Sequence, residues 1–199
     1  EFLEEAKKKN LKVTILGAGS NILFRDNGDK GVIVKLGKDF SYTKIINGNI
    51  LEAGAATLDR KVANFAKDNN LGNLEFLSCI PGSIGGAIMM NSGCYNNDIS
   101  RVLLSVKALD IEKLSEIEIK SEDISFNYRG TNLPNNLIIT SVKIKSLFRK
   151  KEEIEKIQTS LNERKKKSQP SKIKTSGSTF KNFSEERKAW MLIKEAGCE

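Results

Sequence analysis

The chain has 199 residues, of which 39% are hydrophobic and 29% charged, a balance that is ordinary for a globular protein able to bury a core of its own. The formal net charge is +8, but the lysines are spread along the sequence and aromatic residues are few, so the charge fits a basic surface or an anionic small ligand as well as RNA. Histidine is absent, which excludes Ser-His-Asp catalysis, histidine-ligated metals and an imidazole base among these residues.

The first fifty residues predict one helix followed by strands. Residues 2–10 have the pattern of a helix end closed by Asn10, and apolar runs at residues 13–16 and 32–36 are typical of strands. Between these runs lies LGAGSNILFRD, residues 16–26, which is called the first glycine loop below. Asn47-Gly48 separates the apolar runs 42–46 and 50–51, which predicts a two-residue hairpin.

Residues 58–66 predict an amphipathic helix with Thr57 as its N-cap and Gly72 beyond its end. Its apolar stripe consists of Leu58, Val62, Phe65 and Ala66. The helix leads into IPGSIGGAIMMNSGCY, residues 80–95, which is called the second glycine segment below.

The second glycine segment holds four glycines among small and apolar neighbours and no charge, so it does not have the pattern of an ordinary helix or strand. Glycine is expected where the backbone needs a positive φ or approaches a ligand closely, and successive N–H groups in such a segment can hold a diphosphate. The alternative is a buried turn in which the glycines serve packing alone.

The two glycine-rich segments match neither of the common nucleotide-binding motifs. A Walker loop needs Lys followed by Ser or Thr directly after its last glycine, and neither segment has one. A dinucleotide-binding fingerprint needs a third glycine that opens a crossover helix, whereas the first glycine loop runs into a turn at residues 25–28 and then a strand. A P-loop and a Rossmann site are therefore both excluded.

The second half of the sequence predicts further strands and two helices. Strand-like runs lie at residues 102–109, 117–119 and 137–144, with a turn at residues 134–136. Ile154, Ile157 and Leu161 form the apolar stripe of a helix over residues 152–161. Strands and helices mix without regular βαβ alternation, so the fold class is α+β.

The end of the chain predicts a linker, a turn and a last helix. Residues 165–174 have the composition of a linker or loop, and residues 175–180 that of a turn of small residues. A final helix over residues 186–196 is expected to bury Trp190, Leu192, Ile193 and Ala196. The chain starts at Glu1, not Met, and stops directly after this pattern, so we expect an internal part of a longer product.

The three cysteines, Cys79, Cys94 and Cys198, stand at no metal-ligand or redox spacing. We therefore expect free thiols in a reducing compartment and no metal site. No stretch approaches the length of a membrane span, and no secretion signal opens the chain.

Six short motifs occur in order along nearly the whole chain: LGAGSNILFRD, IPGSIGGAIMMNSGCY, FNYRGT, SQP, SGSTFKN and AWMLIKEAG. Together they closely resemble the UDP-N-acetylenolpyruvoylglucosamine reductases, the MurB family. The resemblance implies an FAD-binding domain of the vanillyl-alcohol oxidase and p-cresol methylhydroxylase type at residues 1–147, in lobes of about 1–38 and 39–147. Residues 148–199 would begin a small α/β substrate-binding domain.

The resemblance implies a cytoplasmic flavoenzyme of peptidoglycan precursor synthesis. Its reaction would reduce the enolpyruvyl ether of UDP-N-acetylglucosamine enolpyruvate to UDP-N-acetylmuramate, with bound FAD and with NADPH as the hydride-donating co-substrate. We accordingly expect NADPH and the UDP-sugar as partners, no nucleic acid, no membrane span and a monomer.

The cofactor residues that the resemblance implies lie in the two glycine-rich segments, whose main-chain amides would hold the diphosphate and flank the flavin ring. They are Gly17, Ala18, Gly19, Ser20, Asn21, Ile22, Pro81, Gly82, Ser83, Gly85, Gly86, Ala87, Ser92 and Gly93.

The resemblance implies three catalytic residues, Arg129, Ser178 and Tyr128, and four substrate-binding residues, of which Tyr128 is one. Arg129 corresponds to the arginine of the family's Tyr-Arg pair, and its planar, permanently charged guanidinium suits an enediolate that develops during hydride transfer. Ser178 corresponds to the family's proton donor, and Tyr128 beside Arg129 would contact the substrate. The further substrate-binding residues would be Lys181, Asn182 and Gln169, and the family's catalytic glutamate is expected beyond Glu199.

Taken singly, these residues have plainer interpretations. An arginine in a polar loop is usually a surface charge, Ser178 alone would be a turn residue, and the cluster of basic residues at 164–167 is more often a solvated face than a diphosphate clamp. Trp190 is most simply a core residue.

The sequence also departs from the family pattern in places. Phe183 stands where the family has proline, and Gly130-Thr131 follows Arg129 where a polar residue and serine are commoner. Two other functions stay open: a different flavin oxidase of the same fold, which should lack the Tyr128-Arg129 and Gly177-Ser178 pairs, and a basic module that binds nucleic acid and is colourless.

Overall fold

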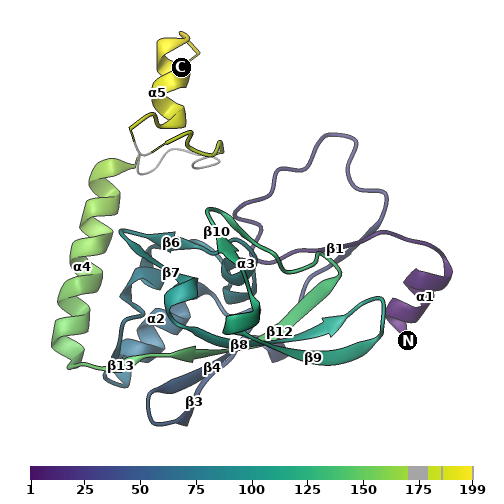
Figure 1. Cartoon of the computed structure of the whole chain (residues 1–199), viewed down its shortest axis with the longest axis horizontal. Helices are drawn as coiled ribbons and strands as arrows, with labels where there is room; N and C mark the ends of the chain where they lie inside the picture. Colours follow the sequence, from purple (N-terminus) through teal and green to yellow (C-terminus); the bar gives the residue numbers. More distant parts are fainter. Residues whose placement is uncertain (170–178, 185, 199) are drawn as a thin grey trace.

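The computed structural model describes residues 1–169, 179–184 and 186–198. At its centre is a five-stranded antiparallel sheet with the strand order β3-β4-β12-β8-β9 (Figure 1). Its strands are β3 (Thr43–Asn47), β4 (Ile50–Gly54), β8 (Leu103–Asp110), β9 (Ser115–Lys120) and β12 (Leu137–Lys145). The hairpin of β3 and β4 and the three strands predicted in the second half are therefore confirmed.

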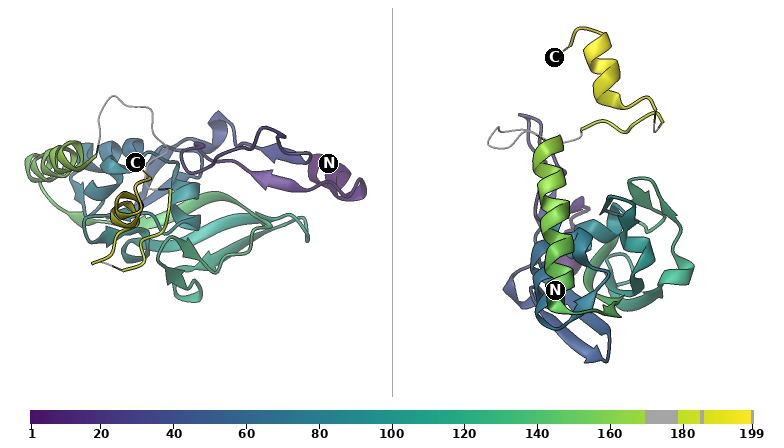
Figure 2. Two further views of the ribbon diagram at one scale, coloured as in Figure 1. Left: turned by 90° about the horizontal axis from the view of Figure 1, so that it is seen from above. Right: turned by 90° about the vertical axis from the view of Figure 1, so that its left-hand side faces the viewer.

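One face of the sheet is covered by α2 (Asp59–Asp68), α3 (Ile84–Met89) and the 3-10 helix η2 (Glu75–Cys79) (Figure 2). The strands alternate, so that every second side chain meets these helices; Leu51 and Ala53 of β4 are both fully buried. Val62 and Ala66 of α2 are buried against them, which confirms the apolar stripe of this helix in its middle part.

A separate arm at one end of the body contains α1 (Phe2–Lys8) and a parallel pair of strands, β1 (Val13–Ile15) and β2 (Val32–Val34) (Figures 1 and 2). Asn10 follows α1 with a φ of +50°, a conformation common just after a helix. The first glycine loop leaves β1 and turns at residues 25–28, where the Gly28 N–H donates to the Arg25 carbonyl (2.8 Å). Its residues Ile22, Leu23 and Phe24 are exposed, Leu23 by 86%.

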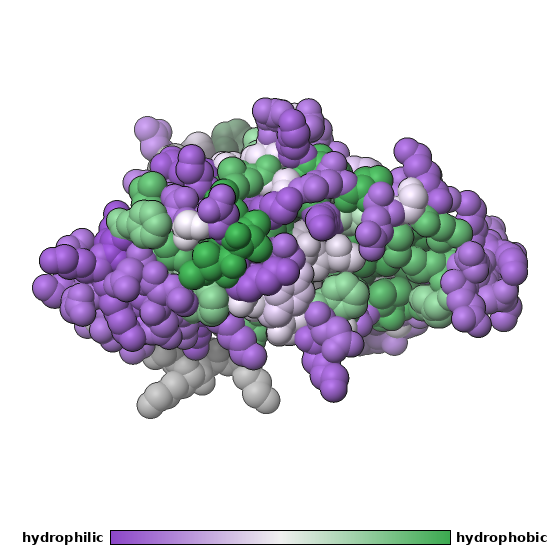
Figure 3. Space-filling view, turned by 90° about the horizontal axis from the view of Figure 1, so that it is seen from below, coloured by the Kyte–Doolittle hydropathy of each residue, from purple (hydrophilic) through white to green (hydrophobic). Residues whose placement is uncertain are grey.

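Helix α4 (Lys151–Ser168) lies along the edge of the body opposite to this arm (Figure 1). It buries Ile154 and Gln158, and Gln158 Nε2 donates to the Ala63 carbonyl of α2 (3.2 Å). Most of its other side chains are charged, so this end of the surface is strongly hydrophilic, whereas apolar side chains gather over the middle and the far half of the same face (Figure 3).

The linker predicted from residue 165 onward is wrong for its first part, because residues 165–168 belong to α4. Lysine is a good helix former, and cations in a last helical turn interact favourably with the helix dipole. Residues 170–174 of the predicted linker and residues 175–178 of the predicted turn lie outside the described residues.

Two local predictions in the first half are wrong in detail. The hairpin turn is Gly48-Asn49 and not Asn47-Gly48, because Asn47 pairs with Ile50 and a bulge separates it from Ile45. Leu58, not Thr57, is the N-cap of α2, and it is 44% exposed instead of being part of the buried stripe. The Thr57 hydroxyl donates instead to the Tyr42 carbonyl (2.8 Å).

The last helix is shorter than predicted, and none of its residues is buried. Helix α5 (Ala189–Glu195) stands away from the sheet (Figures 1 and 2). Trp190 is 61% exposed, and Leu192 and Ile193 are partly exposed, so the expectation that this helix buries them and Ala196 is wrong within the described part of the chain. The reason is that the described residues offer no packing surface beside α5.

The remaining elements are short: η1 (Lys38–Phe40), β5 (Leu71–Gly72), β6 (Gly93–Cys94), β7 (Asn97–Asp98), η3 (Ile99–Arg101), η4 (Ser121–Asp123), β10 (Phe126–Asn127), β11 (Gly130–Thr131) and β13 (Leu147–Phe148). Of the helices that the structure describes, none combines the length and the apolar character needed to cross a membrane.

Candidate active site

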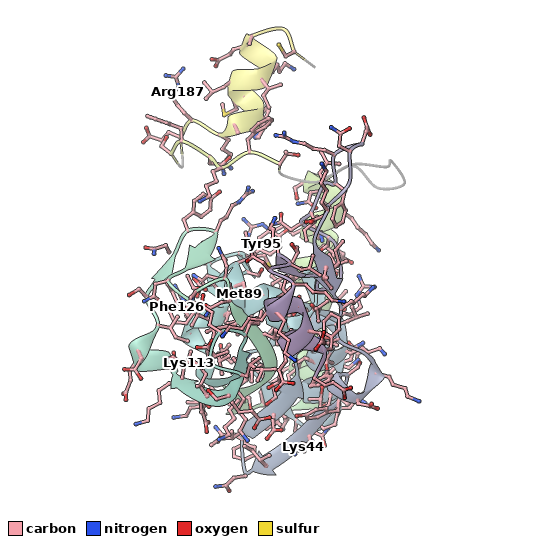
Figure 4. The ribbon with its side chains drawn as sticks, turned by 90° about the vertical axis from the view of Figure 1, so that its right-hand side faces the viewer. Lys44, Met89, Tyr95, Lys113, Phe126 and Arg187 are labelled. Atoms are coloured by element: carbon pink, nitrogen blue, oxygen red, sulfur yellow. The ribbon has the colours of Figure 1, made fainter. Side chains whose placement is uncertain are left out.

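A cleft of about 1700 Å³ runs between the arm, the second glycine segment and the hairpin of β10 and β11. This hairpin, residues 126–131, is called the arginine hairpin below. The fourteen cofactor residues expected from the sequence all line the cleft, together with Tyr128, Arg129 and Gln169. In Figure 4, Tyr95 and Met89 of the second glycine segment lie at the same end of the body as Phe126 of the arginine hairpin, whereas Lys44 of β3 lies far from them.

The second glycine segment is tied by main-chain hydrogen bonds to the strand and helix that precede it. Leu58 and Ser83 form an isolated antiparallel bridge, and the Ile84 N–H donates to the Thr57 carbonyl (2.9 Å). The Gly85 N–H donates to the Ala55 carbonyl (3.0 Å) just after β4. These bonds fix the segment over the end of the sheet.

Part of the second glycine segment is helical, contrary to the prediction that it forms neither helix nor strand. Gly85 and Gly86 lie within α3, and neither has a positive φ. Close approach is what needs glycine here: a Cβ on Gly85 would lie 3.0 Å from the Ala55 side chain. A Cβ on Gly93 would collide with the Asn97 carbonyl across the β6–β7 pair.

The first glycine loop approaches the second glycine segment at Gly17 and at Ser20. A Cβ on Gly17 would lie 2.7 Å from the Ser83 hydroxyl, so a larger residue at this position would require the Ser83 side chain to move. Gly19 has a φ of +80°, a left-handed conformation that glycine adopts without strain. Residues 18–28 are exposed, and residues 17–22 border one side of the cleft.

Asp59 and Ser83 are buried where these two segments meet, and sequence reasoning missed Asp59. Among the described residues, both carboxylate oxygens of Asp59 and the Ser83 hydroxyl are the buried side-chain polar atoms that lack a hydrogen-bond partner. Burial raises the pKa of the Asp59 carboxyl to about 8. An acidic residue in the first turn of a helix is common, so its sequence position carried no signal.

The arginine hairpin carries Tyr128 and Arg129 at its tip. Arg129 has a φ of +58°, in the left-handed region that non-glycine residues rarely occupy, and its guanidinium lies 5.6 Å from the centre of the Tyr128 ring. Two contacts hold the hairpin against the end of α3: Asn91 Nδ2 donates to the Asn127 carbonyl (3.4 Å), and Thr131 Oγ1 donates to the Met89 carbonyl (3.4 Å). The hairpin and the second glycine segment are thus connected directly.

The C-terminal turns of α4 form a cationic border of the cleft. The Arg164 guanidinium lies 4.5 Å from the centre of the Tyr95 ring, and Lys165 Nζ donates to the Cys79 carbonyl (2.6 Å). Cys94 Sγ donates to the Phe76 carbonyl, and burial raises the pKa of its thiol to about 12, so the thiol stays protonated.

Two of the expected site residues do not line the cleft, and a third lies outside the described residues. Lys181 and Asn182 are exposed and do not line it, and the Asn182 side-chain oxygen accepts a hydrogen bond from the Ala189 N–H at the start of α5 (3.1 Å). Ser178, the expected proton donor, lies outside the described residues.

Comparison with known proteins bears on this cleft. Residues 1–113 match the FAD-binding domain family described as "FAD binding domain". The crystal structure of UDP-N-acetylenolpyruvylglucosamine reductase (MurB) from Thermus caldophilus superimposes with a TM-score of 0.82 at 31% identity, over 98% of this chain and 70% of that chain. The chain belongs to the UDP-N-acetylenolpyruvoylglucosamine reductase family.

Curated relatives agree with this assignment. A protein named UDP-N-acetylenolpyruvoylglucosamine reductase from Pelagibacter ubique (strain HTCC1062) is 44% identical over 98% of this chain and 65% of its own length. One of the same name from Wolbachia sp. subsp. Drosophila simulans (strain wRi) is 42% identical over 96% of this chain and 65% of its own length. The chain therefore spans about 65% of the length of these relatives. The family resemblance, the α+β fold and the FAD-binding domain are confirmed.

The residues of the cleft fit FAD on grounds that are independent of these comparisons. Gly17, Gly82 and Gly85 let the segments around the cleft pack closely where a Cβ would crowd a neighbouring residue, and all three line the cleft. The buried polar atoms of Asp59 and Ser83 have no protein partner, as expected of groups that meet a polar ligand.

Proposed function

We propose that the chain is the flavin-binding part of an NADPH-dependent enzyme that reduces UDP-N-acetylglucosamine enolpyruvate to UDP-N-acetylmuramate for peptidoglycan synthesis. One observation carries the proposal: in a chain of this family, both glycine-rich segments and the arginine hairpin line one cleft. A cofactor held by the glycine-rich segments would therefore lie within reach of Arg129.

The two glycine-rich segments would hold the FAD. Main-chain N–H groups of residues 17–22 and of the second glycine segment, both of which line the cleft, would bind the diphosphate without a Lys-Ser/Thr pair. When bound, FAD would take up a hydride from NADPH and supply it to the vinyl carbon of the substrate.

Arg129 would stabilise negative charge on the substrate. Hydride addition to the terminal vinyl carbon leaves charge on the neighbouring carbon and its carboxylate, and a guanidinium fork binds such an enediolate through two hydrogen bonds. Because this charge is larger in the transition state than in the ground state, Arg129 would accelerate the chemical step. Tyr128 would contact the substrate beside it, and Gln169 would approach it from the end of α4.

Ser178 would protonate the carbon that carries this charge. A serine hydroxyl is a weak acid, but a carbanion-like carbon is a strong base, so the position of the donor matters more than its pKa. Lys181 and Asn182 follow Ser178 closely in sequence and would contact the substrate from the same segment.

The domain division and the setting of the enzyme belong to the same proposal. Residues 1–147 would be the FAD-binding domain and residues 148–199 the start of the substrate-binding domain. The enzyme would work as a monomer in the cytoplasm, where UDP-linked precursors are made.

The visible spectrum of the purified protein tests the proposal. A yellow protein whose flavin absorbance is bleached by NADPH and restored by the UDP-enolpyruvyl sugar is the expected result. A protein that takes up no FAD would overturn it, and a flavoprotein that is reoxidised by oxygen but not by the enolpyruvyl sugar would indicate a flavin oxidase of the same fold.

A further inference from the structure

Two buried polar side chains at the junction of the glycine-rich segments have no role in the chemistry above. Asp59 is fully buried, and neither of its carboxylate oxygens has a partner; the Ser83 hydroxyl is likewise buried and unpaired. Burying a carboxyl without a hydrogen bond costs several kcal/mol if it is charged, so such groups usually meet a ligand or another partner.

The position of Asp59 relates it to the cleft. It lies in the first turn of α2, next to Leu58, which pairs with Ser83. A Cβ on Gly82 would lie 2.8 Å from Asp59 Oδ2 and 3.8 Å from Ser20 Oγ of the first glycine loop, so both groups lie beside Gly82. Asp59 and Ser83 both contribute to the lining of the cleft.

The charged groups near Asp59 do not pair with it. Burial is the cause of its raised pKa, and no neighbouring charge adds to it. On its own helix the adjacent residues Arg60 and Lys61 are exposed. The charged side chains that the other elements direct to the cleft are Lys12, Lys35, Asp98, Arg101, Arg129 and Lys165, and its phenols and thiols are those of Tyr95, Tyr128, Cys79 and Cys94.

We propose that Asp59 is a further ligand-binding residue of the cleft, whose protonated carboxyl donates a hydrogen bond to a diphosphate oxygen held between the two glycine-rich segments. The Ser83 hydroxyl is the second donor. The inference rests on the proposed function, because the diphosphate is that of FAD.

The protonation state of Asp59 decides whether its carboxyl strengthens or weakens the binding of a diphosphate. An ionised carboxylate would repel a diphosphate, whereas a neutral carboxyl has a proton to donate. Because burial raises the pKa of Asp59 to about 8, the folded protein is in the donating form at neutral pH. Above pH 8 the Asp59 carboxyl is ionised in the free protein and must take up a proton when FAD binds. The affinity for FAD therefore falls as the pH rises.

Titrating the apo protein with FAD at pH 6 to 9.5, followed by quenching of flavin fluorescence, tests the inference. For the unmodified protein the Kd should be constant below pH 8 and rise by up to about tenfold per pH unit above it. Asp59→Asn keeps a donor that does not titrate, so its Kd should stay within about threefold of the unmodified value at pH 7 and remain flat up to pH 9.5. Ser83→Ala should bind FAD about tenfold more weakly with an unchanged pH profile.

Asp68→Asn removes an exposed acid at the other end of the same helix and is the matched control; it should keep the profile of the unmodified protein. An Asp59→Asn profile equal to that of the control would overturn the inference, and so would an affinity that rises with pH. Tight FAD binding with no pH effect contradicts this inference alone, whereas no FAD binding at any pH contradicts the proposed function as well.

Discussion

Arg129 combines a strained backbone with a permanently charged side chain. Its φ of +58° is a conformation that costs of order 1 kcal/mol in a non-glycine residue and is kept only where the surroundings determine it. Those surroundings are the β10–β11 pairing and the contact from Asn91 to the Asn127 carbonyl. A strained residue at the tip of a short hairpin that borders a cleft is typical of a functional position.

Replacing Arg129 by lysine tests its role in the second half-reaction. Lysine keeps the charge but not the planar fork of arginine. Reoxidation of the reduced flavin by the UDP-enolpyruvyl sugar should therefore slow about 10²- to 10³-fold. The rate of flavin reduction by NADPH and the affinity for FAD should both stay near normal. Stopped-flow absorbance of the full-length protein separates the two half-reactions. Arg187→Lys, on an exposed side chain next to α5, is the control. Near-normal reoxidation in Arg129→Lys would refute the proposed role.

Asp59 should also make the stability of the apo protein depend on pH. Its pKa is about 8 in the folded protein against 3.8 in its unperturbed state, so the folded state binds the extra proton between these values. Stability from this group is therefore fully present below pH 4 and is lost as the pH rises through 8. Asp59→Asn should raise the free energy of unfolding at pH 9 by about 1–3 kcal/mol and leave it little changed at pH 4. Urea denaturation of the apo protein at the two pH values measures the difference; an equal effect at both would contradict it.

At the scale of elements, the two adjacent glycines of α3 differ in whether a Cβ would fit at their position. A Cβ on Gly85 would lie 3.0 Å from the Ala55 Cβ and 3.2 Å from its carbonyl oxygen. A Cβ on Gly86 would meet only the Ser83 hydroxyl, at 3.6 Å, which is ordinary contact. The first glycine permits close packing of α3 on the end of β4, whereas the second lies in an unremarkable helical position.

Alanine at these two positions should therefore have opposite effects on stability. Gly85→Ala forces the end of β4 and α3 apart and should destabilise the apo protein by about 1–3 kcal/mol. Gly86→Ala adds a better helix former without a clash and should change stability by about 0 to 1 kcal/mol in the favourable direction. Thermal unfolding of the two variants beside the unmodified apo protein provides the comparison. Equal destabilisation by both would mean that the close approach at Gly85 is not what limits the packing.

Periodicity explains which elements could be predicted from the sequence. The long strands β8 and β12 and the helix α2 carry a clear alternation or stripe, and each was expected within a few residues of its observed bounds. Two-residue strands such as β6 and β10 are too short to carry a period and depend on tertiary pairing. Helix α5 shows a second limit of prediction from periodicity. An amphipathic pattern predicts an apolar face that can be buried, but it does not say which element covers that face, and Trp190 is exposed.

Only part of the candidate site could be predicted from the sequence, because only some of its residues belong to a local sequence pattern. Motifs with special backbone requirements, such as residues 17–22 and 81–87, are visible in the sequence, and the structure brings them into one cleft. Asp59 could not be found in this way, because its role depends on burial and on missing partners, which no local pattern encodes. Gln158 escaped notice likewise, since its amide is buried by contact with Ala63 of another helix.

At the scale of the whole molecule, α4 connects the end of the chain to the cleft. Asn162 Nδ2 donates to Ser78 Oγ (3.2 Å), and Lys165 Nζ donates to the Cys79 carbonyl, so two successive turns of α4 are attached to the residues that lead into the second glycine segment. The base of α4 is fixed by Arg149, which lies just before it and pairs with Glu75 of η2. The placement of Gln169 at the cleft therefore depends on contacts that begin twenty residues earlier in the chain.

The Arg149–Glu75 pair should be the ion pair that matters most for this connection. Its Nη1–Oε1 distance is 2.7 Å, and the Glu75 side chain is only 7% exposed. Arg149→Ala leaves that carboxylate buried without its partner, which should destabilise the apo protein by about 2–4 kcal/mol, somewhat less than for a fully buried pair because the arginine itself is one-third exposed.

The control is Lys151→Ala, which breaks the ion pair between Lys151 and Asp68. This pair has a similar length, but both of its side chains are about half exposed, so its loss should cost no more than about 1 kcal/mol. Urea denaturation monitored by circular dichroism compares the two variants. If Arg149→Ala proved as mild as Lys151→Ala, the attachment of α4 would have to come from its other contacts, those of Ile154, Gln158 and Asn162.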